Sequence, residues 1–200
     1  MSTSVSEGAV RPTGTRDAIV AAAARLLDEG GPEAVTLRAV AERVGLSHNA
    51  PYKHFQDKEA LLSAVAAREL KALGGIVDAA EGAEPLEALR QMAYAYVRWA
   101  ARYPARFKLT FGVWTRADPE MVHAADDSRI RYVRTIAAAQ KAGDIIGGDP
   151  ERVAVLLLSL GHGAADLALG GHLARDGKGH ADPVDLIDDL LALMKPSTRP

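Results

Sequence analysis

The sequence predicts an all-α protein built from two helical domains. Apolar side chains recur at helical spacing along most of its 200 residues, and no segment shows the alternation of apolar and polar residues typical of a half-buried strand. Glycine and proline punctuate these helical runs. The chain is long enough to bury a sizeable core in one or two domains. We expect an N-terminal arm over 1–14, a first domain over 15–74 and a second over 75–200, with the boundary at the glycine pair 74–75.

Composition excludes several classes of protein. The formal net charge is −2, so the chain lacks the broad basic surface of proteins that coat nucleic acid. Cysteine is absent, which excludes disulfides and thiolate metal sites. The N-terminal residues contain no apolar signal segment, and the longest apolar run, around 153–160, is far shorter than the roughly 20 residues of a membrane-spanning helix. We expect a cytoplasmic protein without a cofactor.

Two helices open the first domain. The arm is low in apolar residues, and the first helix is expected over 15–29, where a Gly-Gly-Pro sequence at 30–32 ends it. Thr36 is the candidate N-cap of a second helix whose buried face recurs at the i, i+3, i+4, i+7 spacing. Gly45 can adopt the left-handed conformation that closes a helix, and this predicts a tight turn directly after it.

A third, unusually polar helix is expected over 47–55, with Ser47 as N-cap and Pro51 tolerated within the first turn. A fourth would begin near Asp57, whose carboxylate suits a helix N-terminus, and run toward Gly74-Gly75. Two short helices around a glycine turn form a helix-turn-helix. Because a helix so polar needs a polar partner, this arrangement predicts DNA binding.

The chemistry of base recognition selects residues at the start of the third helix. Major-groove readers lie near the start of a recognition helix, where Ser47, His48 and Asn49 stand. The amide of Asn49 can pair bidentately with adenine, and His48 could donate to guanine or to a phosphate. Lys53 is a basic side chain on the same helix, whereas Arg38 is equally compatible with a phosphate contact and with a solvated surface.

The second domain reads as helices separated by glycine and proline. They are expected from Pro85 to before Pro104, around 107–111, over 118–141 with a stop at Gly143, after Asp149-Pro150, and from Asp182-Pro183 to the polar tail at Pro196. The helix after Pro150 is apolar on several faces, so it must have more than one surface to bury.

The first domain resembles the DNA-binding domain of the TetR family of transcriptional regulators. The shared pattern is T-x-x-x-(V/I)-A-x-x-(V/A)-G-(V/L)-S followed by Y-x-H-F-x-x-K-x-x-L, and the match runs from about Thr15 to Leu62. Pro51 departs from it, since many relatives have a bulky apolar residue there. The resemblance implies that Tyr52 and His54 lie near the DNA backbone and that Thr36 and Lys58 contact phosphates.

The same resemblance implies a function for the second domain. The last two long helices would pair in a homodimer, and the protein would repress transcription from a palindromic operator until a small apolar or aromatic ligand releases it. Apolar pockets are lined by aromatic groups, although aromatics at helical spacing are also common in a plain core. His162-Gly163 resembles a pair found in some members of the family. The candidate ligand-binding residues are Tyr96, Trp99, Phe107, Phe111, Trp114 and His162.

Two other functions compete with a ligand-controlled regulator. A DNA-binding structural protein without a ligand would keep the helix-turn-helix but lack a cavity. A helical-bundle enzyme could use acidic residues and histidines, but no motif orders them and the helix-turn-helix would be unexplained. His162 and Asp166, at i and i+4, offer only two of the ligands that a metal site needs, so we expect neither a metal nor an enzyme. The enzyme hypothesis would use His123, Asp126, Asp127, His162 and Asp166.

Overall fold

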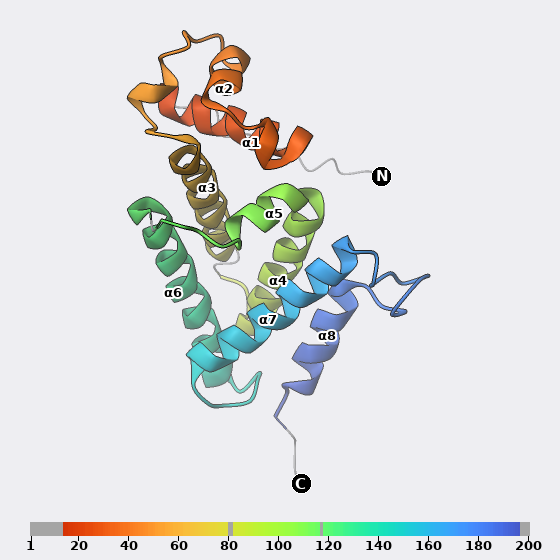
Figure 1. Cartoon of the computed structure of the whole chain (residues 1–200). Helices are drawn as coiled ribbons and strands as arrows, with labels where there is room; N and C mark the ends of the chain where they lie inside the picture. Colours follow the sequence, from red (N-terminus) through yellow and green to blue (C-terminus); the bar gives the residue numbers. More distant parts are fainter. Residues whose placement is uncertain (1–13, 80–81, 117, 197–200) are drawn as a thin grey trace, which may run out of the picture. The chain divides into compact units, whose positions relative to one another are not determined.

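A computed structural model describes residues 14–79, 82–116 and 118–196 and confirms the all-α class (Figure 1). The arm expected over 1–14 lies outside this range except for Gly14. The chain separates into two units after Val65, within a helix that continues through Gly74 and Gly75. The helices are α1 Thr15–Ala34, α2 Leu37–Arg43, the 3₁₀ helix η1 Pro51–Lys53, α3 Lys58–Ala79, α4 Pro85–Arg102, α5 Pro104–Thr110, α6 Pro119–Ala142, α7 Pro150–Leu169 and α8 Pro183–Leu193.

The first unit is a small helical domain in which α1 packs against α2 and α2 against η1. The Gly-Gly-Pro stop behaves as predicted, because Gly30 and Gly31 have non-helical dihedrals and separate the long first part of α1 from a last turn. Ile19, Leu27 and Val40 are fully buried, as are Leu61 and Val65 of α3. The fold of this unit is therefore held by an apolar core to which α1, α2 and the start of α3 contribute.

Both ends of α2 are closed as the sequence predicts. The Ala39 backbone N–H donates to Oγ1 of Thr36 (3.0 Å), which confirms the N-cap. At the other end, Gly45 has φ +69°. The Leu46 N–H donates to the Ala41 carbonyl (2.9 Å) and the Gly45 N–H to the Glu42 carbonyl (3.2 Å), which is the Schellman arrangement. The helix therefore stops at a fixed residue and the chain turns sharply.

The continuous helix predicted over 47–55 is wrong. The chain makes a turn at 48–50 and then the 3₁₀ helix η1. An α-helix would need the nitrogen of Pro51 to donate to the Ser47 carbonyl, but proline has no N–H. The Ala50 N–H donates to that carbonyl instead (2.9 Å), and the Lys53 N–H donates to the Ala50 carbonyl (3.2 Å). Proline thus tightens the segment into i to i+3 turns.

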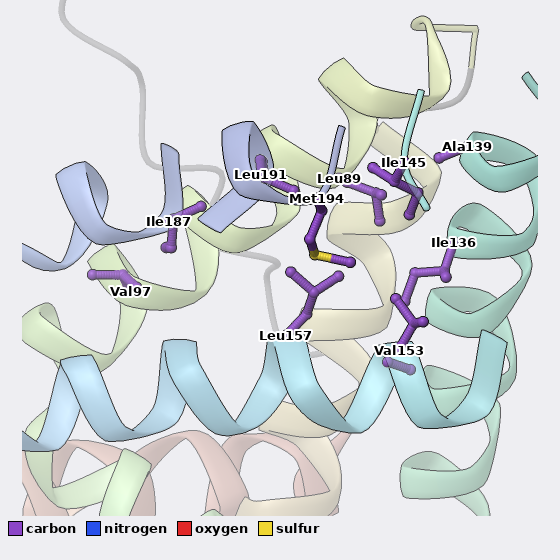
Figure 2. Packing of buried hydrophobic residues seen from close by; sticks show 11 residues of the cluster. Leu89, Val97, Ile136, Ala139, Ile145, Val153, Leu157, Ile187, Leu191 and Met194 are labelled. Atoms are coloured by element: carbon purple, nitrogen blue, oxygen red, sulfur yellow. The ribbon is translucent and has the colours of Figure 1, made fainter. Parts of the chain in front are cut away.

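The second unit is a helical bundle in which α4 packs against α6, α7 and α8. Figure 2 shows side chains from these four helices meeting in one apolar cluster, including Leu89, Ile136, Leu157 and Leu191. The Ile146 N–H donates to the Met194 carbonyl (2.7 Å) and ties the loop after α6 to the end of α8. The cluster packs the four helices together, and this packing positions the side chains on their other faces.

Three helices of this unit begin at an Asp-Pro pair, near the starts that the sequence predicts, and in each the aspartate caps the helix. Asp118 accepts from the N–H of Glu120 (3.0 Å), Asp149 from that of Glu151 (3.1 Å), and Asp182 from those of Val184 and Asp185 in a capping box. The proline that follows fits the first turn, where a missing N–H costs nothing. The predicted stop of α6 at Gly143 is also confirmed, with φ +80°.

Helix α7 combines a buried face with an apolar exposed one. Over the described residues it is the one helix long and apolar enough, by length and composition alone, to cross a membrane, a property shared with core helices of soluble proteins. It packs against α4, α6 and α8, yet Leu156 is 65% exposed and Leu167 47%. These exposed leucines are apolar surface that the isolated chain leaves uncovered.

Replacing two glycines by alanine should have opposite effects on stability. Gly45→Ala forces a side chain into the left-handed region and should lower the free energy of unfolding by about 1–2 kcal/mol. Gly75→Ala, inside α3 with no atom within 4 Å of the added Cβ, should raise it by about 0.4–1 kcal/mol. Urea unfolding followed by circular dichroism measures both. Equal effects of the two substitutions would contradict the assigned backbone conformations.

Candidate functional site

The nine predicted DNA-contacting residues all lie in the first unit, at the start of α2, in the turn after it and at the start of α3. Eight of them are exposed, and the side chain of Lys58 is 38% exposed. Exposure alone does not distinguish a contact residue from an ordinary surface residue, but a contact residue requires it. The nine are Thr36, Arg38, Ser47, His48, Asn49, Tyr52, Lys53, His54 and Lys58.

Two buried side chains anchor the turn that carries most of these residues. Pro51 is fully buried and Phe55 is 3% exposed, whereas Tyr52 between them is 57% exposed. The guanidinium of Arg16, on α1, lies 5.2 Å from the centre of the Phe55 ring. The anchors fix the turn to the core while its hydrogen-bonding side chains remain in solvent. Phe55 therefore belongs to the core of the first unit.

The backbone of the turn also presents unpaired donors. Within the described residues, the N–H groups of His48, Asn49 and Tyr52 make no hydrogen bond to the protein. Backbone N–H groups at such a turn can donate to phosphate oxygens, as those at helix N-termini do. The turn therefore combines backbone donors with the side chains of Lys53 and His54.

The start of α3 is fixed separately from the turn. The Ala60 N–H donates to Oδ1 of Asp57 (2.8 Å), which confirms Asp57 as the N-cap of this helix. Nζ of Lys58 lies 3.7 Å from Oε2 of Glu33, whose side chain is 95% exposed. An ion pair so open to solvent is weak, so Lys58 can exchange it for a phosphate at little cost.

The second unit contains a partly open cavity of about 310 Å³. Its wall is largely apolar and is formed by α3, α4, α6 and α7, with Phe111 from the residue after α5. A cavity of this size and character suits a small apolar molecule. The lining residues are Leu70, Leu73, Ile76, Met92, Ala93, Tyr96, Phe111, Ala125, Ser128, Arg129, Tyr132, Glu151, Ala154, Val155, Leu157, Leu158 and Gly161.

Two tyrosines provide polar groups in this wall. Tyr96 on α4 shares a hydrogen bond with Nδ1 of His162 on α7 (2.9 Å). Tyr132 on α6 makes no hydrogen bond within the described part of the chain. Burial raises the pKa of both phenols, and the neighbouring Tyr132 raises the pKa of Tyr96 further. Both hydroxyls are therefore protonated at neutral pH and able to donate.

A pair of opposite charges lies where the cavity wall meets solvent. Nη1 of Arg129 is 2.7 Å from both carboxylate oxygens of Glu151, and both side chains are about half exposed. The carboxylate of Asp126 lies 3.9 Å from Nε of Arg129. The hydrogen bond that Arg129 donates to Glu151 raises the pKa of Arg129. Two carboxylates thus surround the one cationic side chain that lines the cavity in the described range.

The predicted ligand-binding aromatics divide between the cavity wall and its support. Tyr96 and Phe111 line the cavity, whereas Phe107 is 2% exposed and packs against both Tyr96 and the His162 ring. Trp99 and Trp114 are absent from the wall; Nε1 of Trp114 is buried without a partner among the described residues. The set predicted from aromatic density thus contains wall residues and residues behind them.

The sequence interpretation missed Tyr132, Ser128 and the α3 leucines. Ser128 and Tyr132 are four residues apart on α6, so they share one helix face, and Ala125 precedes them at i−3. That spacing was visible in the sequence, but α6 is rich in charged residues and shows a weak apolar pattern. Glu151, the partner of Arg129 on α7, could not be found from spacing within one helix.

A buried ion pair joins α3 to the helices beside the cavity. The side chains of Glu69 and Arg106 are 5% and 11% exposed, and Oε1 of Glu69 lies 3.2 Å from Nη1 of Arg106. Nε1 of Trp99 donates to the other oxygen of Glu69 (2.9 Å). The Arg106 guanidinium also lies 4.1 Å from the centre of the Tyr103 ring. Trp99 therefore supports α3 instead of lining the cavity.

The residues of the competing enzyme hypothesis do not converge. The part of the chain that the structure describes holds no group of three or more residues suited to a metal ion. Asp127 forms an ion pair with Arg131 (3.0 Å), and His162 is occupied by its contact with Tyr96. The arrangement that the structure does provide is an exposed donor-rich turn in one unit and an apolar cavity in the other.

Comparisons with known proteins match a segment of each unit to a domain family. Residues 19–65 match the family model described as bacterial regulatory proteins of the tetR family, and residues 89–194 match one described as a tetracyclin repressor-like C-terminal domain. The tetracycline repressor protein class C of Escherichia coli is 45% identical over 51 residues. That alignment covers 26% of this chain and 23% of the relative, so most of the repressor's length has no counterpart in the match.

Solved structures resemble the chain over nearly its whole length. A protein of unknown function from Rhodococcus sp. RHA1 is 29% identical, with a TM-score of 0.77 over 94% of this chain and 97% of the other. AibR, solved in complex with isovaleryl coenzyme A and operator DNA, is 21% identical, with a TM-score of 0.63 over 90% of this chain and 98% of the other. The latter likeness shows the fold.

Proposed function

We propose, because this chain belongs to the tetR family of bacterial regulatory proteins, that it is a sequence-specific repressor of transcription. In this proposal a homodimer binds a palindromic operator in the cytoplasm and is released when a small apolar or aromatic ligand occupies the cavity. The family consists of regulators and not of enzymes.

The exposed turn between α2 and α3 carries the DNA-binding part of the proposal. Its donors are concentrated on a few residues, although the whole chain has a formal net charge of −2. A local positive and hydrogen-bonding surface favours binding at one site over coating of nucleic acid. Asn49 is the proposed base reader, and His48 the second. Thr36, Lys53 and Lys58 are the proposed phosphate contacts.

Selection of bound duplexes from a random pool by the purified protein, at two salt concentrations, tests this function. An enriched inverted repeat is the expected result, because a two-fold dimer presents its two recognition segments to inverted half-sites. Weak and steeply salt-dependent binding with no enriched motif would reject the proposal. That result would leave a structural DNA-binding protein as the better reading.

Two substitutions separate base reading from phosphate binding. Asn49→Ala should relax preference at one base pair of each half-site, at a cost of about 1–3 kcal/mol in discrimination. Lys58→Ala should weaken binding on all sequences and reduce the salt slope by about 1 for each protomer. Binding titrations on matched and mutated operators at several salt concentrations measure both effects.

Lys71→Ala is the matched control for the charge change, since Lys71 lies in the second unit, where its side chain pairs with Glu120 (2.8 Å). It should leave operator affinity unchanged. If Asn49→Ala and Lys58→Ala lost the same affinity on every sequence, Asn49 would not be a base reader.

The proposed dimer rests on two apolar stripes on α7 and α8, which lie side by side (Figure 1). Each stripe follows the i, i+4, i+7 spacing of one helix face, and none of its members is buried. A surface of leucines on two adjacent helices suits burial against a second copy across a two-fold axis. The stripes consist of Leu156, Leu160, Gly163 and Leu167 on α7 and Leu186, Leu190 and Leu193 on α8.

The proposed control by a ligand rests on the cavity and on α3. Leu70, Leu73 and Ile76 of α3 form part of the cavity wall, and the same helix begins at Lys58, a proposed phosphate contact. A ligand that binds better to one arrangement of α3 shifts the population toward that arrangement. The cavity favours this function over a structural DNA-binding protein that responds to no ligand.

A further inference from the structure

We infer that the cavity selects a neutral, mainly apolar molecule bearing one hydrogen-bond acceptor, such as a ketone, and that the Tyr132 hydroxyl is the donor that recognises it. This inference rests on the proposed function, in which the cavity holds the effector. It specifies that the effector is neutral and carries one hydrogen-bond acceptor. It also assigns ligand specificity to Tyr132 of α6, which lies outside the aromatic cluster of α4 and α5.

The charges of the wall argue against an anionic ligand. Of the described lining residues, only Arg129 is a cation, and Glu151 contacts its guanidinium through both carboxylate oxygens at 2.7 Å. Asp126 adds a second carboxylate at 3.9 Å. A ligand carboxylate would therefore have to displace Glu151 and would meet a net negative charge. Apart from the hydroxyls of Tyr96, Ser128 and Tyr132, the remaining wall is apolar, so an anion would also lose most of its hydration.

The charges do not favour a cationic ligand either. Both carboxylates already share Arg129, and Glu151, the only carboxylate in the described wall, lies where the cavity meets solvent. A cation held deeper would face leucines, alanines and tyrosine rings. Burial of an unpaired charge in such surroundings is costly. A neutral molecule fills the same space without this penalty.

The polar groups of the wall then define the functional group of the ligand. Tyr96 already shares its hydroxyl with Nδ1 of His162 (2.9 Å), whereas the hydroxyls of Tyr132 and Ser128 make no hydrogen bond within the described chain. Tyr132 and Ser128 lie four residues apart on one face of α6. A phenol is protonated at neutral pH, and burial raises the pKa of Tyr132 further, so its free hydroxyl can donate to a ligand. An acceptor on the ligand satisfies that donor.

Three probes that share a butylphenyl group test the inference. They are 4-butylacetophenone, which is neutral with an acceptor, butylbenzene, which is neutral without one, and 4-butylbenzoate, which is anionic. Calorimetric titration of the full-length protein should give the tightest binding for the ketone. Tyr132→Phe should weaken ketone binding about fivefold, the scale of one net hydrogen bond, and leave butylbenzene binding unchanged. Tyr103→Phe, outside the cavity wall, is the matched control and should change neither.

A second variant tests the charge argument in the opposite direction. Glu151→Gln removes the carboxylate that holds Arg129, so 4-butylbenzoate should bind about threefold more tightly than to the wild type. Ketone binding should remain within twofold. Circular dichroism of each variant establishes that it is folded.

Each remaining outcome would overturn the inference. Tighter binding of the benzoate than of the ketone to the wild type would reject a neutral ligand. Equal losses of ketone and butylbenzene in Tyr132→Phe would reduce Tyr132 to a shaping residue, and no binding of any probe would reject this ligand class. Operator selection uses no ligand, so failure of the DNA-binding function would appear there. If operator selection gave an inverted repeat and the wild type still preferred the benzoate, the DNA-binding function would stand and only the proposed ligand class would be wrong.

Discussion

Arg106→Met should lower the free energy of unfolding of the second unit by about 3 kcal/mol, the largest effect on stability that we expect from one substitution. The substitution keeps most of the side-chain volume but leaves the Glu69 carboxylate 5% exposed without its cation. Trp99 would remain as a single donor to that carboxylate. Removal of one partner from a buried ion pair is costly because the remaining charge stays desolvated.

Urea unfolding followed by tryptophan fluorescence measures this effect in the intact protein. The chain has 2 tryptophans, Trp99 and Trp114, so the signal reports on the second unit. Lys71→Met is the matched control, because it breaks an exposed pair with Glu120 at 2.8 Å and should cost less than about 1 kcal/mol. The double variant Glu69→Leu/Arg106→Met should recover most of the loss. A cost of Arg106→Met no larger than that of the control would contradict the assignment.

Leu156→Glu should convert the dimer into monomers and weaken operator binding by at least about 100-fold, because the avidity of two linked heads is lost. Leu156 is 65% exposed in the single chain, so a glutamate there should leave the fold intact. In the dimer the same glutamate would place two like charges in an apolar contact. Light scattering at micromolar concentration and operator titration measure the two consequences.

Val113→Glu is the matched control for this prediction. Val113 is fully exposed, lies outside both stripes and undergoes the same change from an apolar to an acidic side chain. It should preserve the dimer mass and the operator affinity. Wild-type protein with the mass of one chain, or equal effects of the two substitutions, would exclude the α7 and α8 stripes as the dimer surface.

The helix boundaries were predictable because local chemistry determines them. An aspartate before a proline caps α6, α7 and α8 through atoms within three residues, and Gly45 and Gly143 end their helices through their own dihedrals. The prediction of a continuous helix over 47–55 is wrong for an equally local reason. Proline is tolerated in a first helical turn, but Pro51 would be the residue that donates to the Ser47 carbonyl in an α-helix. Because proline has no N–H, successive tight turns form in place of the helix.

The candidate sites were predictable to different extents. The exposed positions of the DNA-contacting candidates follow from a motif in one short stretch, and their contacts with DNA stay a prediction. The cavity depends on residues from α3 to α7, and no periodicity within a helix reports which side chains leave space between them. Trp99 illustrates the limit, since aromatic density predicted a ligand contact, whereas Glu69, 30 residues earlier, binds its indole nitrogen.

In the turn after α2, the residues that hold the segment to the core are different from the residues that face solvent, and this affects which positions can change during evolution. Pro51 and Phe55 attach the segment to the core, while His48, Asn49, Tyr52, Lys53 and His54 remain exposed. Substitutions at exposed positions usually change stability by less than about 0.5 kcal/mol. Those five exposed positions can therefore be exchanged at little cost to folding, whereas selection for folding acts mainly on the two anchors; under the proposed function such exchanges would change the target sequence.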